Sequence, residues 1–208
     1  MKIAVVAANG RSGRIFVEKA LAEGHFIRAG VHSGSLAPHK NLTIVECDAT
    51  NPTDVANLIK GQDAVVSFIG HVKGSPARVQ TEAMKVLSSA MGTLGIKRLV
   101  SLTGTGVRFP GDRVGFVDWF LNTGIALVDP ERIQDGKDHV ALLQKSQLDW
   151  TVIRVLKLQN VKPESFSLKL HGPTKWFVGR EEVALATLRV LADNSFIRQA
   201  PIIGRDAR

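Results

Sequence analysis

Two glycines stand three residues apart near the start of this chain, directly after a short apolar run from Lys2 to Ala7. The turn that holds them has the sequence Asn9-Gly10-Arg11-Ser12-Gly13. Glycines let backbone N–H groups approach phosphate oxygens, and a helix that starts at such a turn directs its unpaired amides and positive dipole end at the same anion. The spacing predicts a site for the diphosphate of a dinucleotide. An ordinary strand-to-helix turn is the alternative.

The residues after the turn have the spacing of a helix that packs on a sheet. Gly13, Val17, Ala20 and Leu21 recur on one helical face. Gly13 would also let this helix lie close against the first strand. A strand, a glycine turn and a packed helix are the parts that a dinucleotide site needs.

Composition is typical of a globular α/β protein with an anionic ligand. The chain has 208 residues, 44% of them hydrophobic, and a formal net charge of +8. Its basic residues are dispersed, which favours a polyphosphate cofactor over nucleic acid. The only cysteine, Cys47, closes an apolar strand and is expected to be a buried hydrophobe. With no apparent leader or membrane-length apolar run, we expect a cytoplasmic protein that binds neither membrane nor nucleic acid.

Apolar strand patterns alternate with amphipathic helices along the chain, which predicts a Rossmann-type, doubly wound parallel sheet with helices on both faces and one domain over 1–208. The clearest helices run from Pro76 to Leu94, stopped by Gly95, and from Arg180 to about Ala192. The region from Gly111 to Pro130 is the least regular. The expected strands are Lys2 to Ala7, Phe26 to Val31, Leu42 to Cys47, Ala64 to Ile69, Arg98 to Thr103, Trp150 to Val155 and one near Pro201 to Ile203.

With these elements in place, the chain resembles the atypical short-chain dehydrogenase/reductase superfamily. It is most similar to the small NAD(P)H-binding, NmrA-like members, which include biliverdin IXβ reductase/flavin reductase. The motifs that carry the resemblance span nearly the whole chain: AANGRSG, ECDATNPTDV, GQDAVVSFIG, GIKRLVSLTGTG, SQLDWTVIRV and GREEVALATLRVL. The resemblance implies that the segment after Val155 completes a small substrate cleft over the sheet.

The resemblance also implies a set of cofactor-binding residues at the ends of successive strands. The first position of the turn departs from the family because Ala7 replaces glycine, which is tolerable if φ stays negative there. The implied contacts are the diphosphate at Asn9, Gly10, Arg11, Ser12 and Gly13, the adenine at Asp48 and Ala49, the middle of the cofactor at Phe68, Ile69 and Gly70, and the nicotinamide ribose at Thr103.

The end of the second strand predicts NADP rather than NAD, although NAD is possible. An acidic residue there would hold a ribose diol and repel a 2′-phosphate, and this segment contains none. His32 and Ser33, with Arg11 or Lys40, could donate hydrogen bonds to a phosphate. The family more often has arginine in place of His32, so the discrimination is expected to be modest.

The catalytic pair of the superfamily is missing. Typical members use Tyr-x-x-x-Lys, whereas this chain has no tyrosine and Ile133 stands four residues before Lys137. An unactivated ketone needs an acid beside its developing alkoxide, but a flavin, quinone or similar conjugated acceptor can delocalise the charge. Thr103 is the candidate hydroxyl for orienting such an acceptor. An aromatic group could form a platform or lid over it, or else a satellite core or oligomer contact: Phe109, Phe116, Trp119 and Phe120.

Acidic and histidine side chains indicate less about function than the glycine turn does. Asp135, Asp138 and His139 precede a predicted helical segment from Val140 to Lys145, where His139 is a second candidate catalytic residue. A solvated helix surface is the simpler expectation for all three. The other histidines, including His71, are isolated in sequence, so we predict no metal.

Three classes of function remain open. The first is an NADPH-dependent reductase of a small conjugated compound, which the aromatic segment and small size favour. The second is an NmrA-like regulator that senses NAD(P) without turnover. The weakest is an enzyme related to epimerases and dehydratases, against which the missing Tyr-Lys pair argues. The sequence is compatible with a monomer or a homodimer.

Overall fold

The computed structural model describes residues 1–205, which contain one sheet of eight strands in the order β3-β2-β1-β4-β5-β6-β10-β8. The strands from β3 to β10 in this order are parallel, and β8 lies antiparallel to β10 at the edge. The strands are β1 (Lys2–Val6), β2 (Phe26–Val31), β3 (Leu42–Glu46), β4 (Ala64–Ser67), β5 (Arg98–Gly104), β6 (Asp149–Val155), β8 (Phe166–Lys169) and β10 (Ile202–Arg205).

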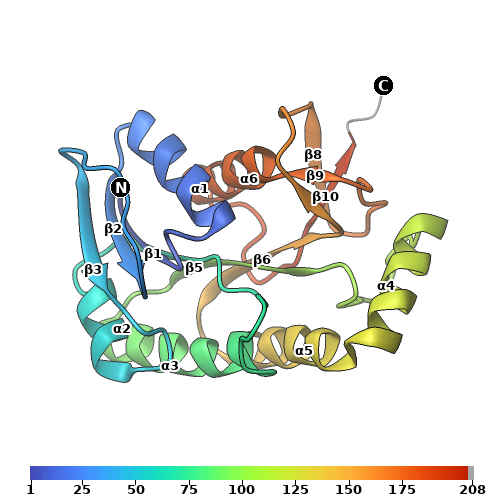
Figure 1. The fold of residues 1–208 in the computed structure, drawn as a ribbon, viewed down its shortest axis with the longest axis horizontal. Helices are drawn as coiled ribbons and strands as arrows, with labels where there is room; N and C mark the ends of the chain where they lie inside the picture. The colour runs from blue at the N-terminus through green and yellow to red at the C-terminus, as the bar shows by residue number, and fades with distance from the viewer. Residues whose placement is uncertain (206–208) are drawn as a thin grey trace.

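Helices cover both faces of this sheet, as the ribbon view shows (Figure 1). One layer holds α1 (Arg11–Ala22) and α6 (Arg180–Ala192), which pack against each other. The opposite layer holds α2 (Pro52–Ile59), α3 (Val79–Leu94) and α5 (Pro130–Lys145). A further helix, α4 (Phe116–Val128), lies at the end of the sheet where β5 leads out.

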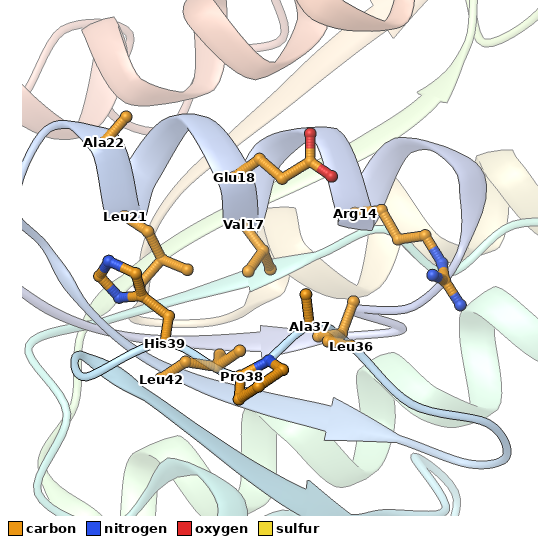
Figure 2. A pocket seen from close by; sticks show the side chains of 10 residues that line it. All are labelled: Arg14, Val17, Glu18, Leu21, Ala22, Leu36, Ala37, Pro38, His39 and Leu42. Carbon is orange, nitrogen blue, oxygen red and sulfur yellow. The ribbon is translucent and has the colours of Figure 1, made fainter.

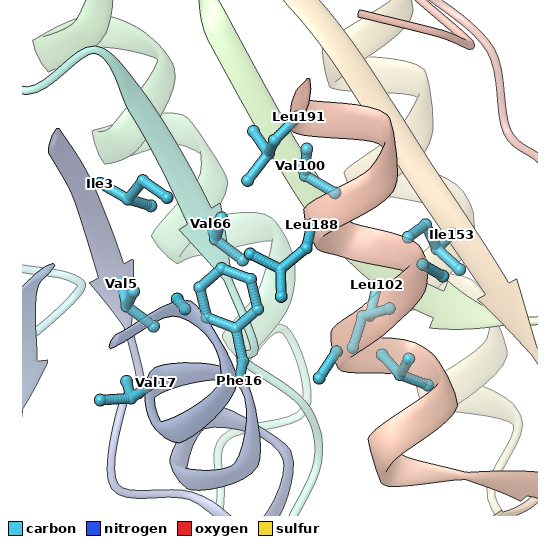
Figure 3. Close-up of a cluster of buried hydrophobic side chains, with 14 of the residues drawn as sticks. Ile3, Val5, Phe16, Val17, Val66, Val100, Leu102, Ile153, Leu188 and Leu191 are labelled. Atoms are coloured by element: carbon cyan, nitrogen blue, oxygen red, sulfur yellow. The ribbon is translucent and has the colours of Figure 1, made fainter. Parts of the chain in front are cut away.

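The apolar strands supply two hydrophobic cores because successive side chains of a strand point to opposite faces. In β1, Ile3 and Val5 join the core under α1 and α6, whereas Ala4 and Val6 join the core over α2, α3 and α5. Figure 3 shows the first of these cores. Burial on both faces explains why the sequence of β1 is continuously apolar instead of alternating.

Local signals set the ends of two helices. The side chain of Asn51 accepts hydrogen bonds from the backbone N–H groups of Thr53 and Asp54, which caps the start of α2. At the end of α3, Gly95 has φ 71°, a left-handed conformation that suits glycine. The predicted stop at Gly95 is therefore confirmed.

The predicted Rossmann-type sheet and its strand sequence are confirmed, with one addition at the edge. The segment 156–179 contributes β8 to the main sheet and forms a small separate sheet from β7 (Leu158–Gln159) and β9 (Val178–Gly179). Antiparallel pairing of β8 with β10 was not predicted, since it joins residues more than thirty positions apart, Lys169 with Ile202.

The region expected to be least regular contains a complete helix. α4 occupies Phe116–Val128 within the range from Gly111 to Pro130. Apolar side chains occur almost all round this helix, so its sequence lacks the stripe that predicts an amphipathic helix. The single buried residue of α4 is its only charged one, Asp118.

Within positions 1–205 no helix combines the length and the apolar character needed to cross a bilayer.

Candidate functional site

The turn between β1 and α1 requires a glycine at position 13. A Cβ added to Gly13 would lie 2.3 Å from the carbonyl oxygen of Ala7 and 2.7 Å from that of Ala8. These are backbone atoms, so the helix could accept a side chain only by moving away from the strand. Gly13 therefore sets the close approach of α1 to β1, which is the role predicted for it.

Ala7 departs from the expected backbone geometry. Its φ is 57°, in the left-handed region, so the negative φ at which an alanine is easily tolerated does not occur here. The turn needs that conformation because the N–H of Gly10 bonds back to the carbonyl of Ala7 over 3.1 Å. An L-residue in this region is strained by about 1–2 kcal/mol, so the alanine is tolerated at a cost in stability.

The start of α1 presents free backbone donors. Arg14 is the first residue whose N–H bonds to a carbonyl of the helix, that of Gly10. The amides of Arg11, Ser12 and Gly13 precede it and have no carbonyl one turn behind them. The first turn of α1 has no side-chain cap and no acidic residue. This geometry fits a phosphate group, for which the dipole and the free amides act together.

Cationic side chains add to this positive edge. Arg11 is the first residue of α1, which follows β1 of the main sheet, and Arg180 is the first residue of α6, which follows β9 of the small separate sheet. Burial lowers the pKa of the Arg180 guanidinium, and the like charge of Arg11 lowers it further. Arg180 donates a 2.7 Å hydrogen bond to Asn160, so a neutral partner holds it. The excess charge here suits a diphosphate.

The ends of β2 and β3 lie next to the diphosphate turn. The side-chain amide of Asn9 donates a hydrogen bond to the carbonyl of Ser33, which ties the turn to the end of β2. His32 and Ser33 are exposed. Hydrogen bonds from the backbone and side chain of Thr50, together with the charge of His32, lower the pKa of the exposed carboxyl of Asp48. A carboxylate beside His32 would compete with a 2′-phosphate for that ring.

At the ends of β4 and β5 the structure places the predicted cofactor residues in two environments. Phe68 packs on α1, its ring centroid 5.2 Å from that of Phe16, and Ile69 packs against the opposite core. Gly70 is exposed. Thr103 is 5% exposed, and a Cβ at Gly136 of α5 would lie 2.8 Å from its hydroxyl oxygen.

Gln80 is a site residue that the sequence did not indicate. Its side-chain amide donates to the carbonyls of Ile69 (2.9 Å) and Leu102 (3.2 Å), so it joins the ends of β4 and β5. A glutamine in the first turn of a helix carries no motif that could have revealed this role.

A cavity of about 460 Å³ opens at this edge of the sheet. Three segments line it: the start of α1, the loop after β4 and the start of α5. Arg11 is the one residue of the predicted cofactor set among its walls, and most of the lining is polar or charged. The lining residues are Arg11, His71, Val72, Lys73, Ser75, Ala77, Asp129, Glu131 and Arg132.

A second hollow, of about 380 Å³, lies between α1 and residues 36–42 (Figure 2). It is mainly apolar, with Val17 and Leu21 on one side and Leu36 and Leu42 on the other. No helix occupies the connection between β2 and β3, which leaves this space beside α1. None of the predicted cofactor residues lines it, but Arg14, which does, donates a 2.8 Å hydrogen bond to the carbonyl of Asn9 in the glycine turn.

The expectation of a solvated surface is wrong for two of the three polar residues of α5. Asp135 and His139 are each 1% exposed, since both point toward α3 and β5 instead of solvent. The Nε2 atom of His139 lies 3.1 Å from the hydroxyl of Ser101, and burial lowers the pKa of its ring to about 4. The structure therefore does not bring His139 to the cavity.

Asp135 caps a different helix. Its carboxylate accepts hydrogen bonds from the backbone N–H groups of Gln80 and Thr81, each 2.9 Å, and from the Thr81 hydroxyl. Its other contact is Nε2 of His71, also at 2.9 Å. Burial alone would raise the pKa of the Asp135 carboxyl, but these hydrogen bonds outweigh burial and lower it. Thus His71, isolated in sequence, has a buried carboxylate partner 64 residues away.

The aromatic group after β5 is mostly exposed. Phe116, Trp119 and Phe120 are 77%, 54% and 62% exposed, and Phe116 contacts the other two rings within α4. Phe109 instead packs under the guanidinium of Arg154, 4.6 Å from its ring centroid. A satellite core does not form from these rings, which leaves a platform, a lid or an oligomer contact.

Across residues 1–205, the structure places no group of three or more His, Cys, Asp or Glu side chains where they could hold an ion.

A mainly parallel sheet, a glycine turn at the start of α1 and strand ends that converge on that turn define a Rossmann-type dinucleotide-binding protein. The sequence matches the NAD(P)H-binding family over residues 7–194, and the chain belongs to that family. The curated relative YwnB of Bacillus subtilis (strain 168), an uncharacterized protein, is 31% identical over 109 residues. That alignment covers 52% of this chain and 50% of YwnB, so the match spans about half the length of that relative.

Solved structures share the fold over nearly the whole chain. A short-chain dehydrogenase/reductase from Veillonella parvula in complex with NADP is 18% identical to this chain and has a TM-score of 0.80. The alignment covers 99% of this chain and 94% of the Veillonella chain. A candidate NADH-flavin reductase from Streptococcus pneumoniae is 19% identical and has a TM-score of 0.76, and the alignment covers 99% of this chain and 100% of that reductase. At these identities the similarity shows the fold alone.

Proposed function

We propose that this protein is an NADPH-dependent reductase that passes hydride to a small conjugated acceptor, such as a flavin or a quinone. The observation that supports it most directly is the open start of α1, where three free amides lie beside the cationic side chain of Arg11. NADPH would supply the hydride when bound. The fold is also that of a candidate NADH-flavin reductase.

The residues of the chain would bind and orient the cofactor. The amides of Arg11, Ser12 and Gly13 would hold the diphosphate, and Arg180, close enough to Arg11 for their charges to interact, would add positive charge. Phe68 and Ile69, fixed by the two cores, would line the middle of the cofactor, and Thr103 would face the nicotinamide ribose. Catalysis would then be mainly proximity and orientation of the acceptor over the nicotinamide.

The acceptor class follows from two features of the chain. It has no tyrosine, so the usual acid of the superfamily is missing, and a conjugated acceptor spreads the incoming charge. The rings of α4, Phe116, Trp119 and Phe120, are exposed on the helix that follows β5. Such rings suit stacking with a planar acceptor.

NADP is the proposed cofactor because the end of β2 carries His32 and Ser33 and no carboxylate of its own. Protonated or neutral, His32 can donate a hydrogen bond to a 2′-phosphate. Asp48 beside it works against a large preference. We further propose a cytoplasmic protein, monomeric or homodimeric, that binds neither nucleic acid nor metal.

One panel of measurements tests the function. Calorimetry with NADPH and NADH gives the two dissociation constants, and NADPH absorbance is then followed with FMN, menadione and biliverdin. We expect NADPH to bind more tightly and to be oxidised with at least one of these compounds. No nucleotide binding would overturn the cofactor site, and tighter NADH binding would overturn the NADP preference.

A regulator that senses NAD(P) is the second candidate. The apolar face of α4 favours it, since Leu127 and Val128 are 81% and 87% exposed and would also suit a protein partner. Tight NADPH binding with no oxidation across the acceptor panel would support the regulator and exclude the reductase.

A further inference from the structure

The geometry points to His71, oriented by Asp135, as the group that protonates the acceptor in this protein. The inference rests on the proposed reductase function and supplies the acid that its missing tyrosine would otherwise provide. A protonated imidazole beside the hydride acceptor can give up a proton as charge develops there.

The position of His71 is the first support. It follows Gly70 directly after the end of β4, and its side chain lines the cavity that Arg11 shares. The start of α1 would hold the diphosphate, so a group across this cavity lies along the path from the diphosphate to the nicotinamide and acceptor. The side chain is 11% exposed, so the ring is held at the wall and is still accessible.

The contact with Asp135 is the second support. Nε2 of His71 lies 2.9 Å from a carboxylate oxygen of Asp135, whose side chain is fully buried. The backbone amides of Gln80 and Thr81 hold that carboxylate at the start of α3. An ionised carboxylate fixes the proton of the neutral ring on Nε2 and stabilises the imidazolium. Nδ1 is then the nitrogen that remains to exchange protons.

Other charged groups around the cavity influence this ring. α1 contributes Arg11, the loop after β4 contributes Lys73, and the start of α5 contributes charges of both signs. The cations favour release of the proton from the imidazolium, and the anions, with Asp135, favour its retention. The groups from α5 that face the cavity are Asp129, Glu131 and Arg132, and Asp138 on the same helix is paired with Arg78 at the start of α3.

The proposed step balances atoms and electrons. The acceptor gains a hydride, with its electron pair, from the dihydronicotinamide of NADPH and a proton from Nδ1 of the His71 imidazolium. NADPH is oxidised to NADP⁺, and the acceptor is reduced by two electrons. His71 is left neutral, with its Nε2 proton still bonded to Asp135, and recovers the lost proton from solvent.

Kinetics of one variant test this role. His71→Gln keeps a donor for Asp135 but cannot titrate, and His25→Gln at the opposite edge of the sheet is the control. We expect His71→Gln to bind NADPH within about twofold of wild type and to transfer hydride to menadione or FMN about 10²-fold more slowly in single turnover. In wild type the rate should fall as the pH rises, because the proposed proton donor is then lost, and the variant should lose this dependence.

A spectroscopic measurement tests the orientation without turnover. In ¹⁵N NMR spectra of the protein alone, neutral His71 should carry its proton on Nε2, and Asp135→Asn should abolish that preference. A proton on Nδ1 in wild type, or equal hydride-transfer rates in His71→Gln and wild type, would overturn the inference alone. Wild type that binds NADPH but reduces none of FMN, menadione and biliverdin would instead overturn the reductase, and the inference would fall with it.

Discussion

Gly13 is the residue on which the diphosphate turn depends most. Ala7 and Ala8 present backbone oxygens 2.3 Å and 2.7 Å from the place of an added Cβ, and neither can rotate away as a side chain could. Glycine is thus required at this strand-to-helix turn because a side chain would not fit there, and not because the backbone must be flexible.

Substitution of Gly13 by alanine tests that requirement. We expect Gly13→Ala to lower the free energy of unfolding by about 1–3 kcal/mol because the helix must shift, and to weaken NADPH binding at least tenfold. Gly92→Ala, in α3 with no atom within 4 Å of the added Cβ, is the matched control and should be neutral or stabilising. Denaturant unfolding and calorimetry measure both effects. Unchanged NADPH affinity in Gly13→Ala would mean that the diphosphate binds elsewhere.

Ala7 offers a second test at the same scale. Because the φ of Ala7 is 57°, we expect Ala7→Gly to relieve the backbone strain. The greater backbone entropy that glycine loses on folding offsets part of this gain, so the net stabilisation should be up to about 1 kcal/mol. Ala8→Gly, at a fully buried position, should destabilise it. Thermal unfolding of the two variants gives the comparison, and a destabilised Ala7→Gly would show that the turn is not strained.

His32 determines the proposed cofactor preference. We expect His32→Arg to raise the ratio of NADH to NADPH dissociation constants about tenfold, about 1.4 kcal/mol, since a guanidinium is always charged and binds phosphate in a bidentate manner. Lys97→Arg, at an exposed position before the start of β5, is the control. Competitive titration of the two nucleotides measures the ratio, and an unchanged ratio would place the 2′-phosphate away from β2.

At the scale of elements, α4 is held by polar contacts and exposes its apolar side. Asp118 accepts hydrogen bonds from the hydroxyl of Thr105 (2.6 Å) and the side-chain amide of Asn122 (2.6 Å), and it pairs with Arg108. Most helices are anchored the other way, by an apolar face in the core. α4 can therefore present its rings to a ligand or partner while it stays attached.

Removal of this anchor should loosen α4 selectively. We expect Asp118→Ala to increase amide hydrogen exchange across residues 116–128 and to lower the free energy of unfolding by about 1–3 kcal/mol, because Thr105 and Asn122 lose their acceptor. Thr123→Ala, at an exposed position of the same helix, is the control. Exchange in β1 and β4 should remain slow in both variants. Equal exchange of α4 in wild type and Asp118→Ala would contradict the anchoring role.

For the whole molecule, His139 makes stability depend on pH. Burial lowers the pKa of its ring from 6.5 to about 4, so between these values the unfolded chain binds a proton that the folded chain does not. Stability therefore rises with pH in this window. The contribution, about 3 kcal/mol, is complete above pH 6.5 and is lost as the pH falls toward 4.

Urea unfolding at several pH values tests this dependence. We expect His139→Gln to flatten the rise between pH 4 and 6.5, whereas His25→Gln should keep it. A rise of the same size in His139→Gln would assign the effect to other groups.

The sequence by itself determined the sheet, most strand positions and the location of the glycine turn between β1 and α1. β1, β4 and the turn at Gly10 and Gly13 are encoded by contiguous residues, because apolar runs and glycine spacing act over a few positions. It also indicated that no tyrosine was available for catalysis. The sequence did not reveal the left-handed φ of Ala7, because the turn that closes on this residue imposes it.

Tertiary structure alone decided what surrounds the cavity. His71 and Asp135 are 64 residues apart, and α3, β4 and α5 must pack before their side chains meet. The burial of His139 likewise depends on neighbours from distant segments. So does the orientation of α4, which buries its charged residue and exposes its apolar side. Hydrophobic periodicity records which face of an element is apolar, but polar contacts between elements leave no periodic pattern in the sequence, so only the folded chain reveals them.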